Sequence, residues 1–417
     1  MKWCCSSAKS RSFKPVRGGD VRAVVVGRPA WIAAAVVAVF AIVLAWVGIH
    51  VTTFSLDETL FHQSAVRYGS GLPETFLHDS AARATSRLYA LLLAPLFAAL
   101  DGDVAIRAAK AVNVLLWCSV AVPVFKLGRS MLSPARAAIG AVLAVVVPWA
   151  SLTTALFTES LALAAFAWFT WAAFEALRAP CWWRDLRVVI LFGVAIGARV
   201  QLAPVLVGYV VLVAWALWEQ TRGGAWWWRT GAVARKVKSY PFTTIVVLIG
   251  GPLLVLFLIH AIGPGPQALL GGYGTSSRAT WVIDVWPMIA AEVVAIGFGL
   301  GIVIPILAVT WYAQSLTYAG PGRLYARTTL VITAAVMVAT GFVQGGFWGS
   351  ATEERYWIYG AIFLWPAALA SVTERRPQPR QLAVAACVFV VSAMLMGAVR
   401  SPDSEGTFLA PVLFTLA

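Results

Sequence analysis

Repeated long apolar runs are the feature that most constrains what this chain can fold into. The first, from 31 to 51, and several later ones approach or exceed the ~20 residues that an α-helix needs to cross a bilayer. Hydrophobic residues make up 60% of the 417 residues and charged residues only 12%, whereas a soluble domain has about 25% charged residues. We therefore expect an all-α fold, that of a polytopic helical membrane protein.

The net charge of +14 would suit a nucleic-acid-binding protein. However, Lys and Arg cluster in short segments between the apolar runs, as the positive-inside bias predicts for cytoplasmic loops. We therefore expect membrane lipids as partners and no nucleic acid. The run after the basic segment 1–29 is too long for the apolar region of a signal peptide. This segment is expected to be a cytoplasmic tail of a multi-pass plasma-membrane protein.

Threading the chain from this tail predicts about eleven spans that alternate across the membrane. They form a transmembrane domain over 30–400, followed by a short tail over 401–417. The first outer loop covers 52–107. Within it, the apolar segment 88–100 is too short to span, so we expect a juxtamembrane helix in the outer interface.

The return helix is expected over 108–127, and later single spans are expected over 137–156, 160–177 and 285–316. The stretch 187–218 begins and ends next to basic loops. It should therefore form a hairpin of two short helices, with Arg199 and Gln201 at its outer tip.

This threading places on the outer side almost every charge that the positive-inside bias does not explain. The polar residues on that side are Asp57, Glu58, His62, Arg67, His78, Asp79, Arg83, Arg87, Glu159, Arg199, Gln201, Asp284, Glu353, Glu354, Arg355 and Tyr356. A site at the outer membrane surface would produce this distribution.

The pair Asp57-Glu58 comes shortly after the first apolar run. Two carboxylates at a membrane boundary indicate chemistry at its surface. The same residues also match a capping box, with Ser55 as the N-cap, Glu58 closing the helix start and Asp57 complementing the helix dipole. Both interpretations can hold together.

Glu159 and Arg199 each interrupt apolar sequence. A charged residue at the centre of a spanning helix costs ~2.5–3.5 kcal/mol on insertion scales, so it is usually kept for function. The alternative for Glu159 is a solvated turn residue, with Thr158 as the helix cap. Arg199 needs a partner, and both Glu159 and a lipid phosphate are candidates.

Glu354, Arg355 and Tyr356 open a late span. The planar fork of Arg355 suits phosphate oxygens, and Tyr356 adds a hydroxyl. The alternative is an anchor belt at the membrane surface.

Together these segments resemble the GT-C glycosyltransferases, multi-span enzymes that take sugar from a polyprenyl-phosphate donor. The chain is similar to bacterial protein O-mannosyltransferases and aminoarabinose transferases, and to actinobacterial mannosyl- or arabinofuranosyltransferases. The matching segments are Leu56-Asp57-Glu58, the interfacial segment 87–97, Thr158 to Leu161, Gly193 to Arg199, and Arg355-Tyr356. Thr85-Ser86 stands where the family usually has Pro-Pro, which leaves the sugar and the acceptor open.

The resemblance implies transfer of a sugar, with mannose or arabinofuranose the leading candidates, to a lipid or glycan acceptor at the outer face with inversion. An acceptor hydroxyl needs a base, and a phosphate leaving group needs cationic stabilisation. The implied catalytic residues are Asp57 as base and Glu58 or Glu159 as orienting groups. Arg355 and Arg199 would hold the donor phosphate with support from Tyr356 and His78, and His62, Gln201 and Glu354 would line the substrate loop.

No cofactor is required by this scheme, although the carboxylates would suit a divalent metal such as Mg²⁺ or Mn²⁺. The rival interpretation is a transporter or flippase of a lipid-linked substrate, which should carry charges inside spans from both faces and internal repeats. A second rival is an acyltransferase built around His78-Asp79. The crowding of charges at one face favours the glycosyltransferase.

Overall fold

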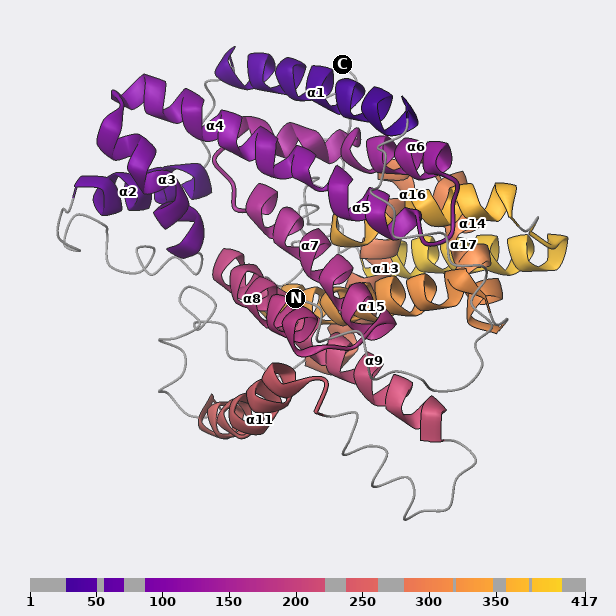
Figure 1. The fold of residues 1–417 in the computed structure, drawn as a ribbon. Helices are drawn as coiled ribbons and strands as arrows, with labels where there is room; N and C mark the ends of the chain where they lie inside the picture. The colour runs from indigo at the N-terminus through magenta and orange to yellow at the C-terminus, as the bar shows by residue number, and fades with distance from the viewer. Residues whose placement is uncertain are drawn as a thin grey trace.

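The computed structural model describes eight stretches of the chain (Figure 1): 28–50, 56–70, 87–221, 238–261, 281–317, 320–347, 358–374 and 377–399. Every regular element in these stretches is a helix, as expected. Of the two expected tails, 1–29 lies outside the described residues except for Arg28 and Pro29, and 401–417 lies wholly outside them. His78, Glu354, Arg355 and Tyr356 also lie outside them.

The first half of the chain forms the part of the bundle that carries most of the predicted site. Its helices are α1 (Arg28–His50), α2 (Leu56–Ser70), α3 (Arg87–Ala99), α4 (Gly102–Ser119), α5 (Ala121–Gly128), α6 (Pro134–Val145), the 3-10 helix η2 (Pro148–Thr154), α7 (Glu159–Arg178), α8 (Trp182–Ala198), the 3-10 helix η3 (Val200–Leu202) and α9 (Pro204–Thr221). The helix expected over 88–100 is present as α3. The expected two helices are present as α8 and α9, with Arg199 and Gln201 in the turn between them, but α8 packs mainly on α7 and α9 mainly on α15 rather than on each other.

The second half of the chain packs against the first. Its helices are α11 (Pro241–Ala261), α13 (Trp281–Leu300), α14 (Val303–Thr317), α15 (Pro321–Phe347), α16 (Ile358–Thr373) and α17 (Pro379–Val399). α15 packs on α9 and α13, and α16 packs on α14 and α6.

Four helices of the described residues are long and apolar enough to cross a membrane. They are Arg28–His50 (α1), Gly102–Gly128 (α4 and α5 together), Glu159–Arg178 (α7) and Val200–Glu219 (η3 and most of α9). The number rises to six if each of two bent helix pairs counts as one span. The chain is therefore consistent with a membrane-embedded protein, but the expected total of about eleven spans is not confirmed.

Two expected single spans are broken. The run over 137–156 bends by 56° between α6 and η2. Val147 before Pro148 is extended, with φ −119° and ψ 156°, because a residue that precedes proline is pushed out of the helical region. The run over 285–316 bends by 119° between α13 and α14. There Gly301 adopts φ +74°, a left-handed conformation that glycine adopts without steric cost.

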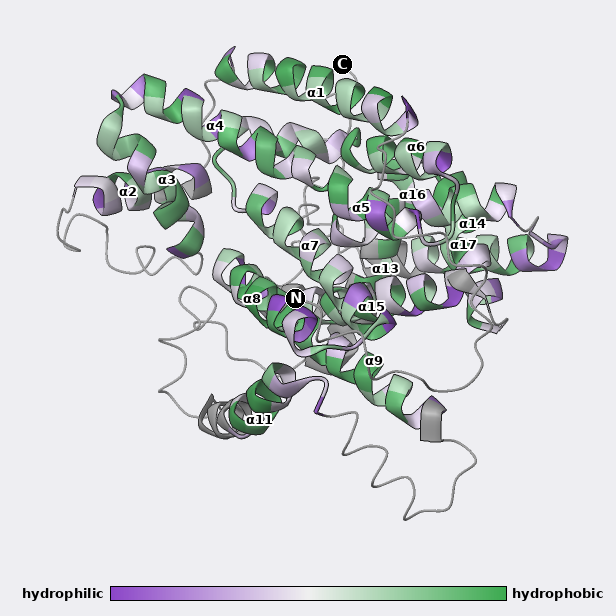
Figure 2. Ribbon diagram, viewed as in Figure 1, coloured by the Kyte–Doolittle hydropathy of each residue, from purple (hydrophilic) through white to green (hydrophobic). Residues whose placement is uncertain are grey.

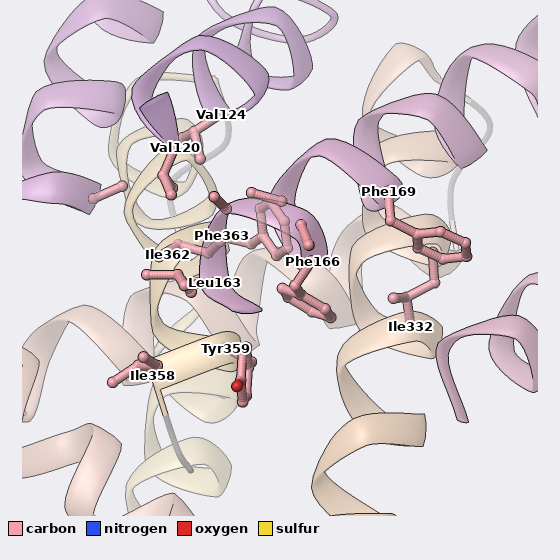
Figure 3. Packing of buried hydrophobic residues seen from close by; sticks show 14 of the residues in the cluster. Val120, Val124, Leu163, Phe166, Phe169, Ile332, Ile358, Tyr359, Ile362 and Phe363 are labelled. Atoms are coloured by element: carbon pink, nitrogen blue, oxygen red, sulfur yellow. The ribbon is translucent and has the colours of Figure 1, made fainter. Parts of the chain in front are cut away.

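Helix α7 is the centre of the bundle, and its side chains are largely buried. Figure 3 shows Phe166 of α7 packed against Tyr359 and Phe363 of α16. The ring centroids of these pairs lie 5.3 and 5.7 Å apart. Helix α1, by contrast, lies at the edge of the array beside α4 and α6, and Gly48 is its one buried residue among those described.

The helices have two chemically different ends. One carries Glu58, Glu159 and Arg199, and we call it the Glu159 end. At the other, the basic end, Lys126 and Arg187 both stack on Trp171, at 4.2 and 5.3 Å from its ring centroid. Trp171 follows Glu159 by twelve residues, about 18 Å along α7. The basic end also includes Arg136, which pairs with Glu374, and Arg327, which pairs with Glu219.

Candidate functional site

A buried polar cluster lies at the Glu159 end, where α2, α3, α4, α7 and the turn after α8 meet. Its members are Glu58, Tyr89, Lys110, Asn113, Thr158, Glu159 and Arg199. Each is less than 9% exposed. Buried polar groups cost free energy unless they are hydrogen-bonded or paired. The stability of this cluster therefore depends on the bonds that its members make.

Glu58 projects from the first turn of α2 into the bundle and is 1% exposed. Its Oε1 accepts a hydrogen bond from the backbone N–H of Leu156 at 3.0 Å, across 98 positions of sequence. Ser55 lies outside the described residues, so the expected capping box is untested. Glu58 therefore links α2 to the segment that precedes α7. This contact does not depend on whether Glu58 also caps the start of α2.

Asn113 and Tyr89 connect three further elements. The Tyr89 hydroxyl on α3 donates to Oδ1 of Asn113 on α4 at 3.0 Å. Asn113 Nδ2 in turn donates to the carbonyl oxygen of Ala155 at 2.8 Å. Burial raises the pKa of the Tyr89 hydroxyl, so this group remains a protonated donor. Segment 155–157 is thus held on one side by Glu58 and on the other by Asn113.

Glu159 and Arg199 form a buried ion pair. Arg199 Nη1 lies 2.9 Å from Glu159 Oε1, and the two side chains are 8% and 0% exposed. The Thr158 hydroxyl lies 3.4 Å from the other carboxylate oxygen. The interpretation of Glu159 as a solvated turn residue is wrong, because its side chain has no contact with solvent. The two partners expected for Arg199 were Glu159 and a lipid phosphate, and the structure pairs it with Glu159.

The turn between α8 and η3 places Arg199. Helix α8 ends at Ala198, and Arg199 itself is extended, with φ −153° and ψ 126°. This turn packs near α3, since a side-chain carbon added at Gly197 would lie 3.0 Å from Leu88 Cδ2. A larger residue at position 197 would require the Leu88 side chain to shift by a few tenths of an ångström.

Lys110 was not predicted as a site residue. Its Nζ donates to the carbonyl oxygen of Gly48 at 3.3 Å and so ties α4 to the last turn of α1. Lys110 and Asn113 are three residues apart and share one face of α4. This spacing within an apolar run could have predicted both residues from the sequence, because polar side chains in spanning helices usually face the bundle interior.

The other predicted residues are less closely involved. His62 lies on α2 with its ring 5.0 Å from the Phe97 ring, and burial lowers the pKa of its imidazole. Gln201 is buried in η3, two residues after Arg199. The backbone of Asp57 belongs to α2, but its side chain is outside the described residues, as are His78, Glu354, Arg355 and Tyr356.

The cluster is balanced in charge, with two carboxylates, one ammonium and one guanidinium. Over the described stretches, no group of three or more His, Cys, Asp or Glu side chains comes together as a metal site would require. A divalent ion at Glu159 would have to displace Arg199, and one at Glu58 would compete with the Leu156 N–H. The arrangement is suited to fixing carboxylates and cations in place at one end of the bundle.

Comparison of the chain with protein-family models and with curated proteins finds no match. The resemblance to the GT-C glycosyltransferases therefore depends on the sequence segments described above.

Proposed function

We propose that the protein is an integral-membrane glycosyltransferase of the GT-C type, which moves a sugar from a polyprenyl-phosphate donor to a lipid or glycan acceptor. The observation that carries this proposal is the buried Glu159–Arg199 pair, with Glu58 nearby in the same polar cluster. Four of the five segments on which the resemblance depends thus contribute residues to this cluster. Four-charge clusters of this kind are costly to bury and are usually kept for function.

The charge distribution gives the proposed orientation. Lys126, Arg136, Arg187 and Arg327 lie at the basic end, and the positive-inside bias assigns such an end to the cytoplasm. The Glu159 end then faces the extracytoplasmic side of the plasma membrane. A polyprenyl-phosphate donor would reach it from the outer leaflet.

The proposed reaction is a single displacement. The acceptor oxygen attacks the anomeric carbon, the bond from this carbon to the donor phosphate oxygen breaks, and the acceptor proton passes to the Asp57 carboxylate. The sugar configuration inverts, and polyprenyl phosphate leaves as an anion. The leaving group needs positive charge rather than an acid, whereas the hydroxyl nucleophile needs the base.

The described residues would position this chemistry. Glu58, fixed by the Leu156 N–H, holds the first turn of α2 and therefore the neighbouring Asp57. Glu159 orients the guanidinium of Arg199 at 2.9 Å. A guanidinium has five N–H donors, so a bond through Nη1 to Glu159 is compatible with a phosphate contact by the same group.

The start of α16 supports a phosphate role for Arg355 and Tyr356, which precede Ile358 by three and two residues. The Tyr359 ring lies 5.3 Å from the ring of Phe166 on α7. Phe166 follows Glu159 by seven residues, about two helical turns. The chain therefore enters α16 close to the Glu159 end.

Purified protein in lipid, incubated with a panel of labelled polyprenyl-phosphate sugars, tests the proposal. We expect transfer from one donor, and a loss of about 10²–10⁴-fold in Asp57→Asn, the range typical of a lost general base. Asp103→Asn is the matched control, because Asp103 is an exposed carboxylate at the start of α4. Equal rates in the two folded variants would remove Asp57 from the mechanism, and no turnover with any donor would sink the proposal.

A second candidate, a transporter or flippase of a lipid-linked substrate, is favoured by the 119° break between α13 and α14. Transporters often build substrate sites from such discontinuous helices. Movement of labelled donor lipid between leaflets without any sugar transfer would favour this candidate.

A further inference from the structure

Helices α1 and α6 enclose an apolar groove at the basic end, far from the polar cluster. The groove has a volume of about 440 Å³. It is lined by Arg28, Pro29, Ile32, Ala33, Val36, Ala135, Ala138, Ile139, Val142 and Leu143. Arg28 is the one charged residue among these, and the rest of the lining is apolar. The groove is therefore an open hydrophobic groove on the surface, with a cation at one end.

Exposed apolar side chains continue from the groove onto the surface around it. Ile32, Val36 and Ile139 are 65%, 45% and 50% exposed, and Figure 2 shows α1 as hydrophobic over most of its length. Contiguous exposed apolar side chains of this kind typically mark a site of contact with a partner, a ligand or a membrane. In a membrane-embedded protein it faces acyl chains, which can enter the groove between the two helices.

The charge around the groove favours an anion at its Arg28 end. Helix α6 begins there at Pro134, after its N-cap Ser133, so it presents the positive end of its dipole, and the first described turn of α1 lies beside it. Neither helix has an acidic residue in its first turn. Arg136, next to the lining residue Ala135, adds a second cation, although it already pairs with Glu374 at 3.5 Å.

We propose that this groove binds an anionic phospholipid, with one acyl chain between α1 and α6 and the phosphate at Arg28. The occupant must be apolar over most of its length and negative at one end, and an anionic lipid of the surrounding leaflet meets both requirements. The inference is independent of the proposed glycosyltransferase activity, because it concerns the opposite end of the helices.

The test uses the full-length protein, equilibrated with equal amounts of phosphatidylglycerol and phosphatidylcholine in mixed micelles and then freed of excess lipid. The retained lipids are counted by mass spectrometry. We expect phosphatidylglycerol to be enriched. Arg28→Gln should lower this enrichment about fivefold, the effect of one basic residue near an anionic membrane surface. Arg129→Gln is the matched control, because Arg129 is exposed near the same end and does not line the groove.

A second pair of variants tests the acyl-chain site. Ala33→Phe fills the groove and should reduce the total retained lipid, whereas Ala34→Phe, at an exposed neighbouring position outside the groove, should not. If Ala33→Phe lowers the melting temperature, Arg28→Gln still decides the question, because Arg28 is exposed and its loss removes no core packing.

Several results would overturn the proposal. They are equal retention of the two lipids by the unmodified protein, equal enrichment in Arg28→Gln and Arg129→Gln, and equal retention in Ala33→Phe and Ala34→Phe. Loss of the enrichment on adding inorganic phosphate at the concentration of the lipid would identify free phosphate as the ligand. A fall in dimer content in Ala33→Phe, with lipid retention unchanged, would identify a second copy of the chain as the occupant.

Discussion

The Glu159 end and the basic end both contain ion pairs, but the pairs differ in their access to water. The side chains of Arg199 and Glu159 are 8% and 0% exposed, whereas those of Arg136 and Glu374 are 44% and 48% exposed. Desolvation makes a buried pair expensive to form and very expensive to break, while an exposed pair contributes little. The exposed Arg136–Glu374 pair therefore costs the fold almost nothing, whereas the buried Glu159–Arg199 pair needs another reason to be there.

The largest expected effect comes from removing one member of the buried pair. Glu159→Gln leaves the Arg199 guanidinium buried without its carboxylate and should destabilise the protein by about 3–5 kcal/mol. Glu374→Gln, its exposed counterpart, should cost about 0–1 kcal/mol. Unfolding of the purified variants, measured side by side in the same detergent, checks this. Similar losses in the two variants would break the distinction between the two ends.

The next largest effect concerns the neutral part of the polar cluster. Asn113→Ala removes the hydrogen bonds to Tyr89 and Ala155 and should cost about 2–3 kcal/mol, because buried partners are left unsatisfied. Tyr89→Phe removes only one of these bonds and should cost about 1 kcal/mol. The same unfolding measurement applies. An Asn113→Ala variant no less stable than Tyr89→Phe would contradict the link between α4 and segment 155–157.

A smaller effect is expected at the basic end. Arg327→Met removes two bonds to Glu219 and the stacking on Trp215, whose ring centroid is 4.5 Å from the guanidinium carbon. Arg323 remains 3.1 Å from Glu219 as a second cation, so the loss should be about 1–2 kcal/mol. The free energy of unfolding of both proteins, measured in low and in high salt, checks this. The difference between them should be smaller in high salt, because salt screens the ion pair. A loss as large as that of Glu159→Gln would erase the difference between the ends.

The smallest effect concerns pH and His62. Burial lowers the pKa of this imidazole in the folded state, so as the pH falls the unfolded chain takes up the proton first. The unmodified protein should therefore lose stability on acidification below the ordinary pKa of histidine, about 6.5, and His62→Asn should lose less. Melting temperatures of the two proteins between pH 8 and pH 5 test this (roughly the range in which histidine titrates). Parallel curves would show that His62 does not contribute.

The sequence predicted the α3 helix, the turn between α8 and α9 and the candidate pairing of Glu159 with Arg199, because each produces a local signal: a short apolar run, basic flanks, or a charge inside an apolar stretch. It did not predict the breaks at Val147 and Gly301, since hydropathy continues through both. Pro148 is a local signal for the first of these breaks.

The polar cluster could be predicted only in part. Glu58, Glu159 and Arg199 were expected at one face, but the partners that fix them were not. The acceptor of Asn113 and the donor to Glu58 are backbone groups of Ala155 and Leu156, and such contacts have no signature in side-chain sequence. They arise only when distant segments pack.

The hydrogen bond from Leu156 to Glu58 has a consequence for biosynthesis. Residues 58, 113, 159 and 199 must all have left the ribosome before the cluster can close. A nascent chain that stops between Glu159 and Arg199 carries a carboxylate at the start of an apolar helix without its guanidinium. The last member of the buried polar cluster to be synthesised is therefore Arg199, in the turn after α8, and premature termination before that turn should direct the product to quality-control proteolysis.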